Sequence, residues 1–206
     1  TKGIPNVEAI LFSKYLMYRS VYWHREVRSA TAMIKKCIKR GLSAGSLYPD
    51  ELYNLDDSSL FARLAQLDQD SSQIATMVKN GHLWPSILEI PLDIDKNNLQ
   101  IDWETREKLE QRLAELLSAN LGLPVSIDQF ILDIPEPISF ETELILYDSG
   151  QPFLKGSTVF TRETMNSFTR ILRVIRLFAM PDLYTQIRAS NRIKEVLRNT
   201  DNWLHL

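Results

Sequence analysis

The feature that most constrains the fold is a helical pattern between Pro5 and Gly41 that no other glycine or proline interrupts. Its length of about 35 residues exceeds the roughly 8 to 20 residues of a typical globular helix. Pro5 suits the first turn of a helix, and Gly41 suits the left-handed residue that ends one. The pattern therefore predicts one long helix at the start of the chain.

Apolar side chains lie on most sides of this predicted helix. Leu11, Tyr15 and Tyr22 lie on one side, with Phe12, Leu16 and Val27 further round, and Ile10, Met17 and Val21 lie on the opposite flank. A helix that is apolar on most sides is normally buried on most sides. Because the remaining chain is too small to cover it, we expect a further domain or a partner chain to do so.

Composition limits the classes of function. The chain has 206 residues and a net charge of -2, which gives no general attraction to nucleic acid or to an anionic membrane. No apolar run approaches the roughly 18 residues that a membrane-spanning helix needs, and no signal-peptide pattern opens the chain. Cys37, the single cysteine, fits a reducing cytosol, and its neighbours favour a packed helical residue. These features predict a cytoplasmic protein without a membrane segment.

The chain begins with Thr1, and its first methionine, Met17, lies inside the helical pattern. We therefore expect a piece of a longer protein. Shorter helices are predicted at 56–66 and 71–80, with Gly81 as the stop of the second. At Trp84 and Pro85 the helical pattern gives way to alternating strand and helix patterns. This change predicts two parts: a helical segment over 1–83 and an α+β region over 84–206.

The second part alternates strand and helix signals. Strands are predicted at 86–94, 126–134, 141–147 and 174–180, and helices at 102–120 and 161–173. The order βαββαβ is that of a ferredoxin-like layer, and Pro181 begins a final amphipathic helix. Residues 170–178 could equally continue the preceding helix. The predicted class is thus α+β: one long buried helix and shorter helices, then a ferredoxin-like layer and a C-terminal helix.

Signals for catalysis are weak. The three histidines, His24, His82 and His205, are far apart, and none is followed by aspartate. Phosphate-binding loops, nucleophile elbows and dinucleotide fingerprints are absent from the sequence. Most carboxylates lie beside basic residues on helices, which is typical of a solvated face. The sequence therefore predicts no catalytic residue and no metal ligand in this chain.

One stripe of the first helix is an exception. Lys14, Tyr18, Tyr22 and Arg25 follow one another at spacings of four, four and three, along roughly 16 Å of helix. A phosphate needs cationic donors, and a sugar or base suits an aromatic wall that carries hydroxyl groups. The alternative interpretation is a core helix whose tyrosines pack and whose basic groups reach water.

The run Lys14-Tyr-Leu-Met-Tyr-Arg-Ser-Val-Tyr-Trp-His-Arg-Glu-Val-Arg28, preceded by Gly3-Ile-Pro-Asn-Val-Glu8, resembles a known segment. It is similar to the segment that follows the metal-binding part of HD-superfamily phosphohydrolases. The most similar members are bacterial proteins resembling deoxynucleoside triphosphate triphosphohydrolases. The later stretch Asp133-Ile-Pro-Glu-Pro-Ile-Ser-Phe-Glu141 looks like the α+β C-terminal region of that family, with less specific motifs.

The resemblance implies roles for several residues. Tyr22 would face the sugar of a nucleotide substrate, with Lys14 and Tyr18 at its polar end. His24 and Arg25 occupy positions that, in a vertebrate relative with SAM and HD domains, face a regulatory nucleotide at a subunit interface. That relative has arginine at the position of Lys14 and histidine at that of Tyr18, so phosphate recognition here would differ.

The family holds its divalent metal with a His, a His-Asp pair and a later Asp, all upstream of this segment. The resemblance therefore implies no cofactor in this chain, a metal in a missing N-terminal HD domain, and a likeness to homo-oligomeric enzymes. The first hypothesis is a C-terminal fragment of a nucleotide phosphohydrolase that supplies a pocket wall and oligomer contacts and is inactive alone. The alternative is a regulatory or protein-interaction module without a catalytic role.

Overall fold

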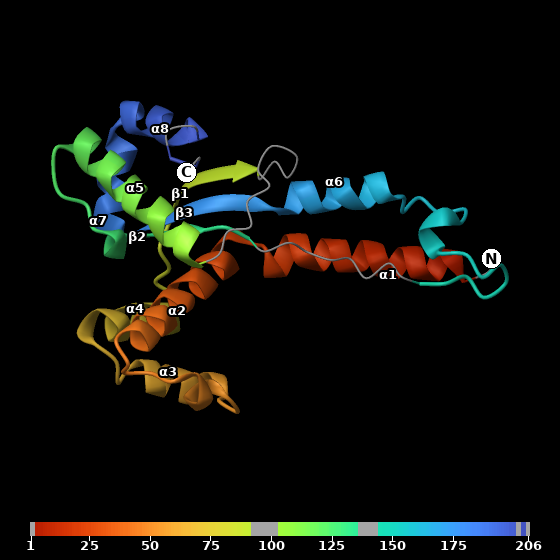
Figure 1. Cartoon of the computed structure of the whole chain (residues 1–206), viewed down its shortest axis with the longest axis horizontal. Helices are drawn as coiled ribbons and strands as arrows, with labels where there is room; N and C mark the ends of the chain where they lie inside the picture. The colour runs from red at the N-terminus through yellow and green to blue at the C-terminus, as the bar shows by residue number, and fades with distance from the viewer. Residues whose placement is uncertain (1–2, 92–102, 136–143, 201–202, 205–206) are drawn as a thin grey trace. The chain divides into compact units, whose positions relative to one another are not determined.

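The computed structural model describes residues 3–91, 103–135, 144–200 and 203–204, and its mixture of helices and strands confirms the α+β class (Figure 1). The α-helices are α1 (Ile4–Met17), α2 (Arg25–Ser43), α3 (Asp57–Leu64), α4 (Gln69–Lys79), α5 (Trp103–Leu121), α6 (Arg162–Leu172), α7 (Pro181–Ala189) and α8 (Asn191–Arg198). The strands are β1 (Ser86–Pro91), β2 (Phe130–Asp133) and β3 (Val174–Ala179). Shorter turns are η1 (Tyr18–Tyr22), η2 (Pro49–Leu52), η3 (Ile127–Gln129) and η4 (Phe153–Lys155).

The chain forms two compact units, each built from distant segments. The first combines Thr1–His24, Glu89–Gln100 and Ile134–Ile175, and the second combines Arg25–Leu88, Ile101–Asp133 and Arg176–Leu206. The division into a helical segment over 1–83 and an α+β region over 84–206 stays a prediction. In the described residues, no helix is both long and apolar enough to span a membrane.

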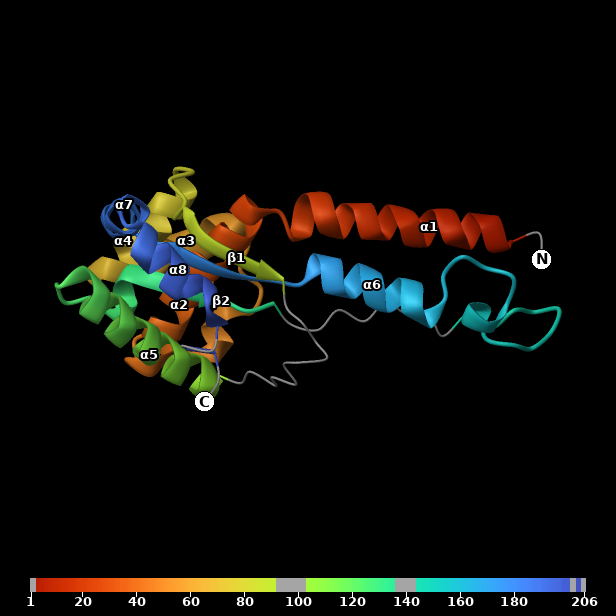
Figure 2. The ribbon, with the colours of Figure 1, turned by 90° about the horizontal axis from the view of Figure 1, so that it is seen from above.

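The first unit packs α1 alongside α6, as two views of the ribbon show (Figures 1 and 2). Its core joins one face of α1 to α6 and to the segment around η4, through Ile4, Leu11, Phe153, Phe160 and Met165. The Tyr15 ring stacks on Phe168, with 4.3 Å between ring centroids. Glu8 ties the two segments together, because its carboxylate accepts hydrogen bonds from the Thr158 hydroxyl at 2.7 Å and the Val159 N–H at 3.0 Å.

The prediction of one long helix is wrong, because the helix breaks at Trp23 and His24. The Trp23 N–H donates to the Tyr18 carbonyl at 2.8 Å, which closes the wider turn of a π-helix over η1. Trp23 has left the helical region, at φ -111° and ψ 10°, and is buried with Tyr15 and Leu172. Burial of this large aromatic side chain accompanies a break that no glycine or proline marks in the sequence.

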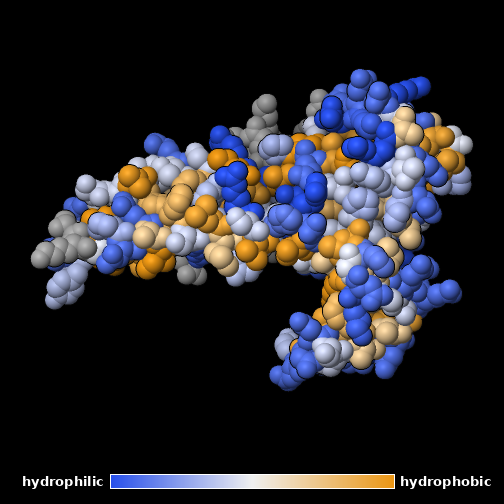
Figure 3. Space-filling view, turned by 180° about the vertical axis from the view of Figure 1, so that it is seen from behind, coloured by the Kyte–Doolittle hydropathy of each residue, from blue (hydrophilic) through white to orange (hydrophobic). Residues whose placement is uncertain are grey.

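The expectation that this helix is buried on most sides also needs correction. In α1 one face is buried, whereas Ile10, Phe12 and Met17 on its other sides are 66%, 50% and 47% exposed. Figure 3 shows apolar surface along the part of the molecule that α1 and α6 form. The first unit thus carries apolar side chains that the described residues leave open to solvent.

The second unit packs α2 against α4, and α4 against α3. Its core includes Met33, Cys37, Leu64, Ile74, Trp84 and Phe178. Cys37 is buried as predicted; its Sγ donates to the Ser71 carbonyl at 3.3 Å, and burial raises the pKa of its thiol to about 11. A Cβ at Gly41 would lie 2.9 Å from the Leu47 Cβ, so glycine permits a close approach here.

The sheet has the order β1-β3-β2, and β2 pairs antiparallel with β3 so that Phe130 faces Ala179 and Asp133 faces Arg176. The described residues thus form three of the four predicted strands. The strand predicted at 141–147 is the exception. Residues 141–143 lie outside the described residues, and within 144–147 only Ile145 makes an isolated bridge, to Pro152. β3 is a strand, so the alternative of continuous helix over 170–178 is wrong. The four-stranded ferredoxin-like layer is therefore not seen in the described part of the chain.

Candidate functional site

The stripe predicted from the sequence is only partly continuous in the structure. Lys14 lies in the last turn of α1 and is half-buried, and Tyr18 and Tyr22 follow in η1. The rings of Tyr18 and Tyr22 lie side by side, with 5.4 Å between their centroids. Tyr18 packs against Tyr15 and the core around it, whereas Tyr22 is 54% exposed. The structure therefore presents two adjacent tyrosines, the second of which is open to solvent.

The helix break separates this group from the rest of the predicted stripe. His24 lies at the break and is exposed, and Arg25 is the first residue of α2 and is also exposed. Arg25 belongs to the second compact unit, whereas Lys14, Tyr18 and Tyr22 belong to the first. The roles of all five residues stay predictions. The described residues include no group of three or more His, Cys, Asp or Glu side chains that could hold a metal ion.

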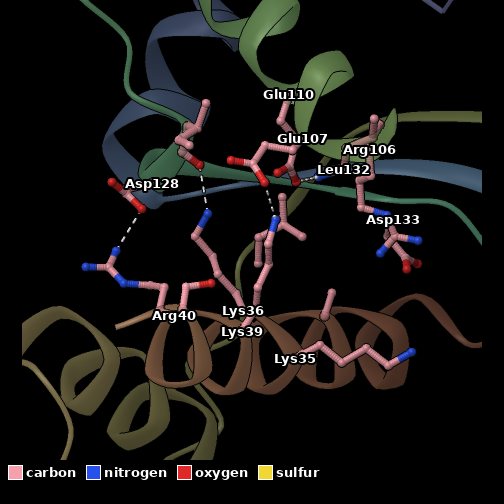
Figure 4. A pocket seen from close by; sticks show the side chains of 14 residues that line it. Lys35, Lys36, Lys39, Arg40, Arg106, Glu107, Glu110, Asp128, Leu132 and Asp133 are labelled. Carbon is pink, nitrogen blue, oxygen red and sulfur yellow. Dashed lines mark hydrogen bonds and ion pairs between the residues drawn. The ribbon is translucent and has the colours of Figure 1, made fainter. Parts of the chain in front are cut away.

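The structure adds a cavity that sequence reasoning missed. A space of about 200 Å³ lies between α2, α5 and the segment from η3 to β2, all within the second unit (Figure 4). Lys35, Lys36, Lys39 and Arg40 line it from α2, because residues three and four positions apart lie on the same side of a helix. Glu107 and Glu110 of α5, with Asp128 and Asp133, supply carboxylates on the other sides.

Two ion pairs join α2 to the opposite walls of the cavity. The Lys39 ammonium lies 3.2 Å from the Glu107 carboxylate, and the Arg40 guanidinium lies 2.7 Å from Asp128. Arg40 also contacts Asp68 at 3.2 Å and Asp70 at 3.0 Å, near the start of α4. Since Lys39 and Arg40 are only partly buried and their carboxylate partners are exposed, the pairs contribute little stability and mainly orient the charges.

The two ionisable groups deeper in the cavity have displaced pKa values. The Lys36 ammonium donates to the Ile127 carbonyl at 2.7 Å and to the Phe130 carbonyl at 3.1 Å, and burial lowers its pKa. The Glu110 carboxylate accepts a hydrogen bond from the Leu132 N–H at 3.1 Å. Glu110 is 8% exposed, and burial raises its pKa although Lys36 acts in the opposite direction. Each group thus loses its charge more easily than it would in water.

Asp133 is buried at the end of β2 and is held by a forked contact with Arg28. The Arg28 Nε donates to one carboxylate oxygen at 2.8 Å, and its Nη2 donates to the other. A bidentate arginine fixes a carboxylate in position as well as neutralising it. Asp133 is therefore a structural anchor of the cavity wall.

The sequence pattern indicated only the basic wall of the cavity. Four basic residues on one face of α2 are visible in the sequence, but their partners are remote: Lys39 and Glu107 are 68 positions apart, and Arg40 and Asp128 are 88 apart. The partial burial of Lys36 depends on how α2 packs against η3 and β2. That packing could not be read from the spacing of the residues.

Comparison with known proteins gives two matches. A family model described as "HD associated region" matches residues 1–151. An uncharacterized protein of Methanocaldococcus jannaschii is 24% identical over 206 residues, which is 97% of this chain and 44% of the relative. The chain thus spans less than half the length of the curated relative it matches.

Proposed function

Because the chain belongs to the HD associated region family, we propose that it accompanies an HD domain in a metal-dependent phosphohydrolase that acts on nucleotides. In this proposal the HD domain holds a divalent metal, which activates water for attack on a phosphate. The present chain supplies one wall of the nucleotide pocket and contacts between subunits of a homo-oligomer. The buried single cysteine is compatible with the cytoplasm as its location.

The observation that carries the proposal is the arrangement of Tyr18 and Tyr22. Two adjacent aromatic rings, one open to solvent, suit the face of a sugar or base, and their hydroxyl groups suit its polar edge. Lys14 precedes Tyr18 by four residues and can offer a point charge to a phosphate. His24 and Arg25, both exposed, remain proposed contacts with a regulatory nucleotide or a neighbouring subunit.

The partner proposed for this surface is the HD domain itself. Ile10, Met17 and Val21, which share one flank, leave apolar surface uncovered on the segment that leads into the two tyrosines (Figure 3). Contiguous exposed apolar surface commonly marks a contact with another protein surface. An HD domain that covers this face of α1 would meet the tyrosines at the edge of the same interface.

The test compares the full-length parent protein with its Tyr22→Ala variant, using Mn²⁺ and a panel of deoxynucleoside triphosphates. Loss of an aromatic stacking contact costs about 1–3 kcal/mol, so kcat/KM should fall by about 5- to 150-fold. Tyr53→Ala is the matched control, because Tyr53 is 73% exposed in the second unit, and it should leave kcat/KM unchanged. Equal kcat/KM for wild type and Tyr22→Ala would remove Tyr22 from the pocket.

A second assay examines the chain by itself. Since the proposal assigns the metal and its water to the HD domain, the chain alone should hydrolyse no nucleotide above background with Mn²⁺. Metal-dependent hydrolysis by the purified chain would contradict this assignment.

An alternative function is a regulatory or protein-interaction module without a catalytic role. The cavity between α2, α5 and β2 favours it, because this cavity is built without Lys14, Tyr18 or Tyr22. The gene sequence upstream of Thr1 discriminates between the two proposals. A His…His-Asp…Asp pattern in the preceding few hundred residues supports the phosphohydrolase, and its absence favours the module.

A further inference from the structure

We propose that the cavity between α2, α5 and β2 binds a small zwitterion of the α-amino acid type, whose carboxylate accepts a hydrogen bond from Lys36 and whose ammonium donates to Glu110. The site lies within the second unit and uses none of the residues proposed to contact a nucleotide. The proposal of an amino-acid site can therefore be tested independently of the proposed phosphohydrolase activity.

Lys36 offers the donor. An ammonium group has three N–H donors, and the carbonyl groups of Ile127 and Phe130 accept two of them. These contacts fix the position of the nitrogen at the cavity wall. Among the described residues the third N–H meets no acceptor, so it is left for an anionic group of a ligand.

Glu110 offers the acceptor. One of its oxygens accepts the Leu132 N–H, and within the described residues the other accepts no hydrogen bond. A carboxylate in water has about four acceptor positions, so Glu110 retains unused capacity on the side that lines the cavity. Glu110 as a whole is 8% exposed, so little of the residue faces bulk water.

Lys36 and Glu110 influence each other electrostatically, yet these two described residues share no direct ion pair or hydrogen bond. Buried charges are costly unless an opposite charge or hydrogen bonds satisfy them. A ligand with a negative group next to a positive group would satisfy both residues at once. A ligand that carries only one of the two charges would satisfy only one of these residues.

The size of the cavity and the apolar part of its lining suit a small ligand with an aliphatic group. The volume of about 200 Å³ lies below the roughly 300–1,000 Å³ of pockets for drug-sized molecules. Ala32, Ile131 and Leu132 form apolar wall, which suits an aliphatic side chain. The neighbouring Asp133 is already neutralised by Arg28, so it does not compete for the ammonium.

The test is isothermal titration calorimetry of the chain with L-alanine, L-valine and L-leucine. Isocaproate and isoamylamine serve as analogues of leucine that lack the ammonium or the carboxylate, and inorganic phosphate serves as a simple anion. Each charge-assisted hydrogen bond is worth about 1.5–3 kcal/mol, so each single-charge analogue should bind at least about tenfold more weakly than leucine.

Two variants separate the contacts. Lys36→Met should weaken leucine and isocaproate alike by at least about tenfold. Glu110→Gln keeps an acceptor for the Leu132 N–H but loses its charge, so leucine should bind no better than isocaproate. Lys108→Met and Glu104→Gln are matched controls on the exposed face of α5, where the two side chains pair at 2.8 Å, and they should leave binding unchanged.

Several outcomes would overturn the proposal. These are the absence of saturable binding by all three amino acids, equal affinity of the wild type for leucine and isocaproate, and tighter binding of phosphate than of leucine. Circular dichroism verifies that each variant is folded. If Lys36→Met fails to fold, two measurements still test the proposal: the affinities of the wild type for leucine and its analogues, and the affinities of Glu110→Gln for leucine and isocaproate. A folding defect would weaken both ligands and could not by itself remove the preference for leucine over isocaproate.

Discussion

Lys36 and Glu110 are ionisable residues whose surroundings oppose their charged forms. Burial is the largest cause of both displacements: it lowers the pKa of the lysine and raises the pKa of the glutamate. Their mutual attraction reduces these effects without cancelling them. Such pairs recur at binding and catalytic sites, where a fold retains charges that cost it stability.

The raised pKa of Glu110 predicts a pH dependence of stability. The folded protein takes up this proton at a higher pH than the unfolded chain does, so the cost of burying the carboxylate is present above the folded pKa. That cost is relieved as the pH falls toward the ordinary value of 4.5. Urea unfolding at about pH 7 and about pH 5 should therefore show wild type gaining stability relative to Glu110→Gln at the lower pH.

The exposed Glu104→Gln variant is the control for this measurement, and its difference from wild type should vary less between the two pH values. Parallel pH profiles of wild type and Glu110→Gln would show that burial does not shift the pKa of Glu110.

At the scale of elements, helix starts were predicted better than helix continuity or the stop at Gly41, which lies inside α2. The predictions at 56–66, 71–80 and 161–173 correspond to α3, α4 and α6, because Asp56, Asp68 and Thr161 accept hydrogen bonds from nearby backbone N–H groups. These signals lie within a few residues of the structure they determine. At the break, Trp23 packs instead against Leu172, a residue far along the chain, and this contact could not be read locally.

The same distinction applies to the candidate sites. The spacing of Lys14, Tyr18 and Tyr22 is a local property, and it correctly placed the two tyrosine rings together. Extending that stripe to Arg25 assumed regular helix through Trp23, and the break invalidates the assumption. The cavity of the second unit joins residues 68 and more positions apart, so its acidic wall was beyond local reasoning.

The cap of α4 gives a prediction about an element. The Asp68 carboxylate accepts hydrogen bonds from the Ser71 N–H at 3.1 Å and the Ser71 hydroxyl at 2.6 Å. Asp68→Ala should lower the free energy of unfolding by about 1 kcal/mol, as expected for loss of an N-cap, measured by urea denaturation. Asp57→Ala, in the first turn of α3 but without the capping position, is the control. An equal or larger loss in the control would contradict the assignment.

At the scale of the whole molecule, each compact unit has its own apolar core. Leu117 is fully buried in the second unit, and Met165 and Phe153 are buried in the first. Leu117→Ala should destabilise by about 2–5 kcal/mol, since it opens a cavity in a packed core. Hydrogen exchange should then accelerate in α5 and α8 while the amides of α1 and α6 keep their rates.

Leu123→Ala is the control, because Leu123 is 36% exposed and its loss opens no buried cavity. Its free energy of unfolding should fall less than that of Leu117→Ala. Uniform acceleration throughout the chain after Leu117→Ala would show that the two units unfold as one.

The exposed apolar side chains of α1 also bear on how long the protein survives in a cell. Surface of this kind attaches to other exposed apolar surface, including that of unfolded chains. Copies whose α1 stays uncovered are therefore the first to aggregate or to be degraded, while covered copies persist. If an HD domain covers α1, as proposed above, the abundance of the protein depends on the supply of that domain.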